Sequence, residues 1–280
     1  MSGAFTAACI QLCSGRDIAP NIAAASELVR RARERGADLI MTPEVSDMIE
    51  PRRGLRVEKA KPEGEHAMLA AFQGLARETG AWLLLGSIVV AEAGDERLRN
   101  RSILLAPDGR IAARYDKIHM FDVSLAGGES YRESAAFRPG EEAVLAGLPW
   151  GVLGMTVCYD LRFPHLYRAL AQAGARFLTV PSAFTVPTGR AHWHVLLRAR
   201  AIENFCFVFA PAQCGEHAEG RRTYGHSLIV APWGEILAEG GDEAGVILAE
   251  IDPDKAEEAR RAVPSLSHDR PFTPPHGFGA

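Results

Sequence analysis

The chain contains 280 residues, carries a formal net charge of -4 at pH 7 and is 47% hydrophobic, which is sufficient for a buried core in one or two domains. Acidic and basic residues are interleaved, as in 30–35 and 254–261, and are not gathered into a basic stripe. We therefore expect no nucleic-acid partner and no attachment to an anionic membrane.

The first half of the chain alternates strand-like and helix-like segments. In chain order it predicts a strand (7–12), a helix (21–35), a strand leading to Glu44 (37–42), a helix (65–78), a strand (82–90) and a hairpin leading to Lys117 (102–106 and 110–115). Pro107-Asp108-Gly109 forms the hairpin turn, because proline presets one turn dihedral and glycine tolerates the other.

The second half continues this alternation without a low-complexity linker, and we predict one domain. It predicts a loop (127–139), a strand ending at Cys158 (152–157), a helix (163–172), a strand (177–180), a helix (191–204), a strand (206–211), a hairpin (227–230 and 235–238), a strand (245–251) and a helix (253–262). Hairpins do not fit a purely parallel sheet, so mixed sheets with helices outside are expected.

The cellular location and the state of the cysteines are inferred from features that the sequence lacks. Residues 1–13 contain no basic segment followed by an apolar run, and no stretch is long enough to cross a bilayer, so a cytoplasmic location is expected. The five cysteines, Cys9, Cys13, Cys158, Cys206 and Cys214, are odd in number and have no close paired spacing. This pattern argues against a disulfide framework and against a zinc knuckle.

Three residues at the ends of predicted strands could carry chemistry. Cys158 lies at a strand-to-helix turn, where nearby amide groups and the helix dipole would favour a thiolate, although a small buried side chain is the commoner role of cysteine. Glu44 follows an apolar strand, and burial would raise its pKa towards that of a useful base. Lys117, taken alone, is predicted to be a surface lysine paired with Asp116.

The combination of these residues changes the interpretation. They stand in Pro43-Glu44, then in Tyr115-Asp116-Lys117-Ile118-His119-Met120-Phe121-Asp122, and then in Cys158-Tyr159-Asp160-Leu161-Arg162-Phe163-Pro164. In type and order these segments resemble the three catalytic blocks of the nitrilase superfamily of carbon-nitrogen hydrolases. The resemblance continues through 127–134, 191–193 and 197–204, and so covers nearly the whole chain.

The resemblance implies an α/β fold, a four-layer α-β-β-α sandwich in which two mixed sheets pack face to face with helices outside. It implies a hydrolase domain over 1–262 that assembles into a homodimer or larger homo-oligomer. The C-terminal tail, 263–280, is rich in proline, phenylalanine and histidine and is too short to fold alone, so we expect it to pack at a subunit interface. The resemblance implies neither a metal nor a cofactor.

The implied reaction is hydrolysis of a carboxamide through a thioester. Glu44 takes the proton of Cys158 as its sulfur attacks the carbonyl carbon, and later activates a water that releases the acid. The Lys117 ammonium and the backbone N–H of Tyr159 bind the oxyanion, and ammonia leaves. Glu133 helps to position the substrate and the lysine.

The residue after the nucleophile indicates the branch. True nitrilases typically carry tryptophan there, so Tyr159 favours a small-molecule amide over a nitrile. Three segments look closest to the Nit-type branch: 127–131, 181–185 and 212–217. The acyl group stays open, with ω-amides of keto acids and N-carbamoyl amino acids as alternatives. Arg132 and Arg162 could bind a substrate carboxylate, although scaffolding through Asp160 is favoured for Arg162.

Other classes of protein stay open when the residues are taken alone. A Cys–His hydrolase or acyltransferase could use one of four histidines as base, although none has an evident orienting acid: His119, His192, His217 or His226. A zinc hydrolase built on His192 and His194 is disfavoured, because residues two apart face different sides of a helix. A non-catalytic interaction scaffold is the third alternative.

Overall fold

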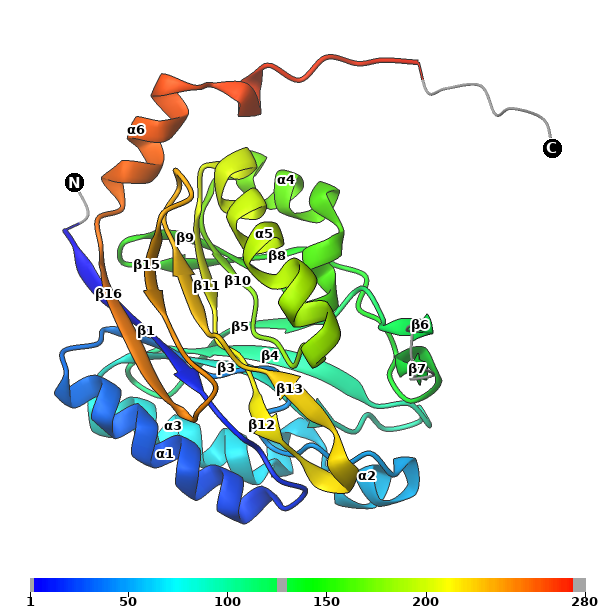
Figure 1. Ribbon diagram of the computed structural model, residues 1–280. Helices are drawn as coiled ribbons and strands as arrows, with labels where there is room; N and C mark the ends of the chain where they lie inside the picture. The colour runs from blue at the N-terminus through cyan, green and yellow to red at the C-terminus, as the bar shows by residue number, and fades with distance from the viewer. Residues whose placement is uncertain (1–2, 125–129, 274–280) are drawn as a thin grey trace.

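A computed structural model describes residues 3–124 and 130–273, and two six-stranded sheets lie at its centre (Figure 1). Residues 127–129 of the segments that resemble the superfamily, and residues 274–280 of the tail, lie outside the described residues.

The first sheet surrounds a parallel centre with antiparallel strands. Its spatial order is β16 (Gly245–Ile251), β1 (Phe5–Gln11), β2 (Leu39–Met41), β3 (Trp82–Val90), β4 (Arg99–Leu105) and β5 (Ile111–Asp116). Strands β1, β2 and β3 are mutually parallel, whereas β16, β4 and β5 pair antiparallel to their neighbours.

The second sheet repeats this plan. Its spatial order is β15 (Ile236–Glu239), β14 (Leu228–Val230), β11 (Phe207–Ala210), β10 (Ala175–Thr179), β9 (Gly151–Met155) and β8 (Val144–Leu148). Strands β11, β10 and β9 are parallel, and β14, β15 and β8 are added by antiparallel pairing. Both sheets are therefore mixed, as the predicted hairpins required.

Alternate residues of β1 enter two different cores. Ala7 and Cys9 belong to the core shared with the second sheet, whereas Ala8 and Ile10 pack in the core beneath helices α1 and α3. Successive side chains of a strand point to opposite faces, so a strand covered on both faces is apolar throughout.

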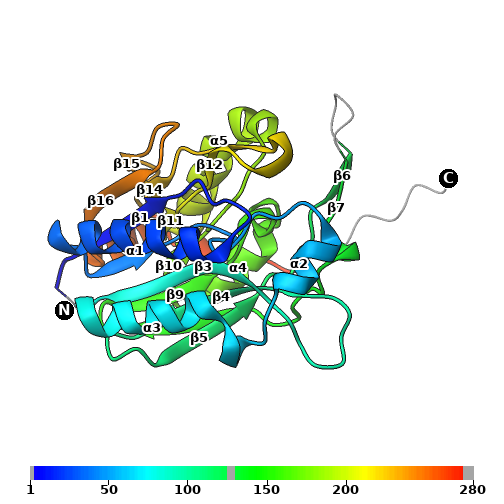
Figure 2. The same ribbon diagram turned by 90° about the horizontal axis from the view of Figure 1, so that it is seen from below.

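Helices cover the outer face of each sheet. Helices α1 (Ile18–Glu34) and α3 (Ala67–Thr79) lie side by side on the first sheet, and α4 (Pro164–Gln172) and α5 (Val186–Asn204) lie on the second (Figures 1 and 2). The expected four-layer α-β-β-α sandwich is confirmed.

Several element boundaries differ from those predicted. Helix α5 begins at Val186 and not at 191, with Pro187 in its first turn, where proline is preorganised for a helix start. Helix α1 begins at Ile18 and not at 21. Six short elements were not predicted: α2 (Arg53–Lys59), β6 (Asp122–Ser124), β7 (Ser130–Arg132), β8, β12 (Cys214–Glu216) and β13 (Arg222–Tyr224).

The C-terminal segment leaves the sandwich after helix α6 (Asp254–Ala262) and extends away from it in Figure 1. Side chains of α4 hold the start of the tail, since Arg168 donates to the Ser265 carbonyl at 2.6 Å and Gln172 donates to the Leu266 carbonyl at 3.1 Å. Over the described part of the chain, no helix has the length and apolar character needed to cross a membrane.

Candidate active site

The three residues singled out in the sequence meet between the two sheets. Glu44 follows β2 and Lys117 follows β5 of the first sheet, whereas Cys158 follows β9 of the second. Each residue stands beyond the carboxyl end of its strand, and these ends lie at one edge of the sandwich because β2, β3 and β5 run in the same direction. Loops at such an edge commonly form ligand sites in α/β proteins.

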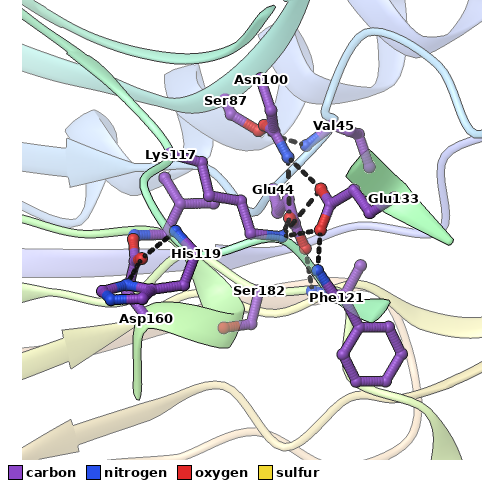
Figure 3. A network of polar contacts seen from close by, with 12 residues as sticks. Glu44, Val45, Ser87, Asn100, Lys117, His119, Phe121, Glu133, Asp160 and Ser182 are labelled. Atoms are coloured by element: carbon purple, nitrogen blue, oxygen red, sulfur yellow. Dashed lines mark hydrogen bonds and ion pairs between the residues drawn. The ribbon is translucent and has the colours of Figure 1, made fainter. Parts of the chain in front are cut away.

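Lys117 lies between two carboxylates (Figure 3). Its Nζ is 2.9 Å from Glu44 Oε1, and 2.9 and 2.8 Å from the two oxygens of Glu133. Its side chain is 2% exposed. Burial opposes the charge, but Glu133 and Glu44 together raise the pKa of Lys117 well above its ordinary value, so the ammonium persists.

The surface role predicted for Lys117 is wrong. Asp116 instead forms two bonds with Arg101, at 2.7 and 3.0 Å. Consecutive residues of a strand point to opposite faces, so Asp116 cannot follow Lys117 into the interior.

Glu44 is buried and is held by four donors. Lys117 and the Asn100 amide, at 2.9 Å, reach Oε1, the Ala183 backbone N–H reaches Oε2 at 3.0 Å, and the Cys158 thiol also donates to the carboxylate. Burial alone would raise its pKa, as the sequence suggested, but the Lys117 charge and these hydrogen bonds bring the pKa below its ordinary value. Glu44 is therefore a carboxylate at neutral pH.

Cys158 opens a short 3-10 helix, Cys158–Arg162, and α4 begins only at Pro164. Its φ of 50° is left-handed, and its N–H donates to the Pro181 carbonyl at 3.0 Å. Burial and the adjacent Glu44 charge raise the pKa of the thiol well above its ordinary value, with Lys117 acting in the opposite direction. The thiolate expected from the helix dipole is therefore wrong: the proton rests on sulfur.

Asp160 fixes the turn that carries Cys158. Its carboxylate accepts the Val157 N–H at 2.8 Å, the Tyr115 hydroxyl at 2.7 Å, and both the backbone N–H and Nδ1 of His119. The scaffolding pair predicted for Arg162 and Asp160 is not formed. The Arg162 guanidinium lies instead 6.0 and 5.6 Å from the centres of the Tyr159 and Phe184 rings.

The geometry does not favour a histidine base. Two of the four candidates do have an acid, contrary to the prediction, because His119 contacts Asp160 at 2.7 Å and His226 contacts Glu239 at 3.1 Å. His217 is held through both ring nitrogens by the Ser14 carbonyl and the Thr223 hydroxyl. His192 contacts Arg162, and none of these four histidines lines the cavity described next.

A cavity of about 690 Å³ contains the site. Glu44, Lys117, Glu133, Cys158 and Tyr159 all line it. Four arginines also line the cavity: Arg53, Arg56, Arg132 and Arg221. Arg162 is not among the lining residues, so of the two arginines considered from the sequence only Arg132 faces this space.

Four functional features were not found in the sequence. Asn100 and the Ala183 N–H orient Glu44 from positions 56 and 139 residues away in the chain. Arg56 and Arg221 reach the cavity from segments in which no helix or strand was predicted. Only the turn-like composition around Gly215 and Gly220 could have indicated a loop at the site.

The fold and the site together define a hydrolase of carbon–nitrogen bonds. The family model for carbon-nitrogen hydrolases matches residues 6–261, and the chain belongs to this family.

Its relatives include one named deaminated glutathione amidase from Synechocystis sp., which is 41% identical over 94% of this chain and 97% of the relative. The Caenorhabditis elegans NitFhit crystal structure superposes with a TM-score of 0.91 at 36% identity, covering 96% of this chain and 66% of that protein. A mutant amidase from Nesterenkonia sp. AN1, with acrylamide added at its active-site cysteine, gives a TM-score of 0.78 at 28% identity and covers 93% of this chain and 98% of that one.

Proposed function

We propose that this enzyme hydrolyses the amide bond between a 2-oxo dicarboxylic acid and an amine, with deaminated glutathione as its substrate. The main observation in support is that Cys158, Glu44 and Lys117 form a buried cluster in a cavity that is also lined by arginines. The relative from Synechocystis supports the choice of substrate.

In the proposed reaction, Cys158 Sγ attacks the amide carbonyl carbon as its proton passes to Glu44. The oxyanion formed is bound by the Lys117 ammonium and the Tyr159 backbone N–H. When the tetrahedral intermediate collapses, Glu44 returns the proton to the leaving nitrogen, and a thioester remains. Glu44 then takes a proton from water as the hydroxide attacks the thioester carbonyl carbon. When this second tetrahedral intermediate collapses, Glu44 returns the proton to the departing Cys158 sulfur, and the carboxylic acid is released.

Glu133 has a defined electrostatic part in this scheme. In the first step a negative charge moves from Glu44 to the oxyanion, and both positions lie beside Lys117. Because both Glu133 oxygens contact Nζ, the ammonium has a second counter-charge while Glu44 is neutral. Glu133 also accepts the Phe121 N–H at 2.7 Å, which ties the carboxylate to the chain beyond Lys117.

The leaving group from this substrate is an amine and not the ammonia expected from the sequence. Ammonia is released only where the cleaved bond carries an unsubstituted NH2 group, and deaminated glutathione contains no such group on an acyl carbon. Its cleaved amide joins 2-oxoglutarate to the cysteine nitrogen, so the products are 2-oxoglutarate and cysteinylglycine. A cavity of about 690 Å³ lies in the size range of sites for ligands this large.

The cavity arginines suit the carboxylates of such a substrate. The Nε of Arg221 is buried and finds no hydrogen-bond partner among the described residues. Burial lowers the pKa of Arg56, and the neighbouring positive charges of Arg221 and Arg53 lower it further, whereas Glu133 and Glu50 act in the opposite direction. A bound carboxylate would satisfy the free donor and offset these positive charges.

Replacing Arg221 by Met is expected to raise KM for deaminated glutathione by roughly 10- to 100-fold. This factor corresponds to the binding free energy of one charge-assisted hydrogen bond. The matched control is Arg222→Met, because Arg222 is the exposed neighbour on β13. Steady-state kinetics on both variants checks this. Equal KM values for the two variants would show that Arg221 does not bind the substrate.

The substrate is tested by following 2-oxoglutarate release from deaminated glutathione and from alpha-ketoglutaramate, and ammonia release from N-carbamoyl amino acids. We expect the largest kcat/KM for deaminated glutathione. A preference for alpha-ketoglutaramate would make the chain an omega-amidase, and turnover of none of these substrates would support the scaffold alternative.

The pH profile distinguishes a glutamate base from a histidine base. The pKa of Glu44 lies below its ordinary 4.5 and that of Cys158 above its ordinary 9.0, so neither group titrates near neutrality. We expect kcat/KM to be level between about pH 6 and pH 8, and to fall on the acid side only as Glu44 gains a proton. An acid limb near pH 6.5, measured on initial rates, would indicate a histidine base instead.

We further propose that the tail, 263–280, packs against a second copy of the chain. Phe272, in the described part of the tail, is 83% exposed, more than any other large apolar side chain among the described residues. Truncation after Ala262 should convert a dimer to a monomer in light scattering, whereas truncation after residue 273 keeps the contact. A dimer that survives the first truncation would contradict the proposal.

A further inference from the structure

Two histidines and a glutamate converge on the outside of the second sheet, away from the cavity. His194 lies on α5, His226 lies between β13 and β14, and Glu239 ends β15. Each offers one ligand atom, and these atoms all lie within 4.8 Å of one another. None of the three lines the active-site cavity, so the proposed amidase reaction gives them no part.

The distances are close to those of a metal-binding cluster. His194 Nε2 is 2.8 Å and His226 Nδ1 is 3.1 Å from the same oxygen of Glu239. Around a tetrahedral zinc ion with bonds of about 2.0–2.1 Å, neighbouring ligand atoms stand roughly 3.3 Å apart. The two nitrogen–oxygen distances would therefore lengthen by only a few tenths of an ångström around the ion, and the two histidine nitrogens already lie within 4.8 Å of each other.

The cluster is held by buried neighbours. The fully buried Trp193, next to His194, donates its indole N–H to the His226 carbonyl at 2.7 Å. His226 has a left-handed φ of 54°, uncommon for a residue with a side chain, and its ring stacks on Tyr224 with centres 4.4 Å apart. Metal affinity depends on ligands fixed in this way by their surroundings.

The surroundings also leave room for a ligand from solution. The side chains of His194, His226 and Glu239 are 30%, 24% and 38% exposed. His226 Nε2 is 3.3 Å from Asp242, and a carboxylate on the second ring nitrogen of a ligating histidine fixes the tautomer that presents Nδ1. Three protein ligands with an open fourth position are a common arrangement for zinc.

We propose that His194, His226 and Glu239 bind a divalent transition-metal ion of the zinc class. The ion joins the outer helix α5 to the edge strand β15, which stabilises the fold, and a ligand from solution takes its fourth position. The site also explains why the zinc alternative based on His192 and His194 fails: His192 points to Arg162, and the partners of His194 come from distant strands.

The test is a Zn²⁺ titration of the full chain, freed of metal with a chelator. Cysteine thiols also bind zinc, so all proteins carry Cys13→Ser and Cys158→Ala, which remove the exposed thiol and the thiol of the site. We expect one bound ion by calorimetry and a rise in Tm on the order of 5 °C at a hundredfold excess over Kd.

Matched variants decide whether these residues bind the ion. His194→Ala and Glu239→Gln should lose the binding and the rise in Tm, whereas His192→Ala, two residues away on the same helix, should keep both. His226→Asn provides a further variant that tolerates the left-handed backbone. No bound zinc in the parent protein, or equal binding by His194→Ala and His192→Ala, would overturn the proposal and leave an ion-pair cluster.

Discussion

Replacement of Glu44 by Gln should lower kcat by roughly 10²- to 10⁴-fold, because the proposed base becomes an amide that cannot accept the thiol proton. Gln has nearly the shape of Glu, so the Ala183 N–H keeps an acceptor and the fold is retained. Steady-state kcat, with circular dichroism to verify folding, checks this result.

Glu50→Gln is the matched control for Glu44→Gln. Glu50 also lines the cavity, and its carboxylate pairs with Lys59 at 3.4 Å, away from the nucleophile. It should keep most of the wild-type kcat. A kcat near the wild-type value for Glu44→Gln would mean that another group takes the proton.

Replacement of Lys117 by Met should impair both catalysis and stability. Loss of one oxyanion donor lowers kcat by about 10²- to 10³-fold. Because Glu44 and Glu133 then face each other without the ammonium, the free energy of unfolding at pH 7 should fall by about 3–5 kcal/mol. Kinetics and denaturant unfolding measure the two effects, with the exposed Lys255→Met as control.

The stability loss of Lys117→Met should depend on pH in a defined direction. Without the ammonium, burial and mutual repulsion raise the folded-state pKa of the carboxyl pair, so the variant gains stability as the pH falls from 7 to 5. In the wild type the folded-state pKa of Glu44 is depressed, and its stabilisation is lost only below pH 4.5. A pH-independent deficit would show that lost packing, not charge, destabilises the variant.

The layers of the fold could be predicted because the buried strands are marked in the sequence by apolar runs and by turn residues between them. The continuous apolar run of β3 and the turn before β5 are local features of the sequence. Helix α2 has no buried residue, so it lacks the apolar periodicity that marks a helix. Pro187 is the local signal for the start of α5 at Val186, because proline is favoured in the first turn of a helix.

The protonation state of the site could not be predicted from the sequence. Chain order identified Glu44 and Cys158, but the pKa of each depends on groups brought close by folding. Lys117 reverses the expected shift of Glu44, and the ionised Glu44 in turn keeps the proton on the thiol. The thiol does not lie at the start of α4, because a 3-10 helix separates the two, so the dipole of α4 does not set its pKa.

The most direct test compares Cys158→Ala with Cys13→Ala on the best substrate of the wild-type enzyme, by following the carboxylic acid product. Cys13 is an exposed thiol outside the site and controls for general effects of losing a cysteine. We expect Cys13→Ala to match the wild-type rate and Cys158→Ala to release no product above the uncatalysed rate. Turnover by a folded Cys158→Ala protein would contradict nucleophilic catalysis by this cysteine.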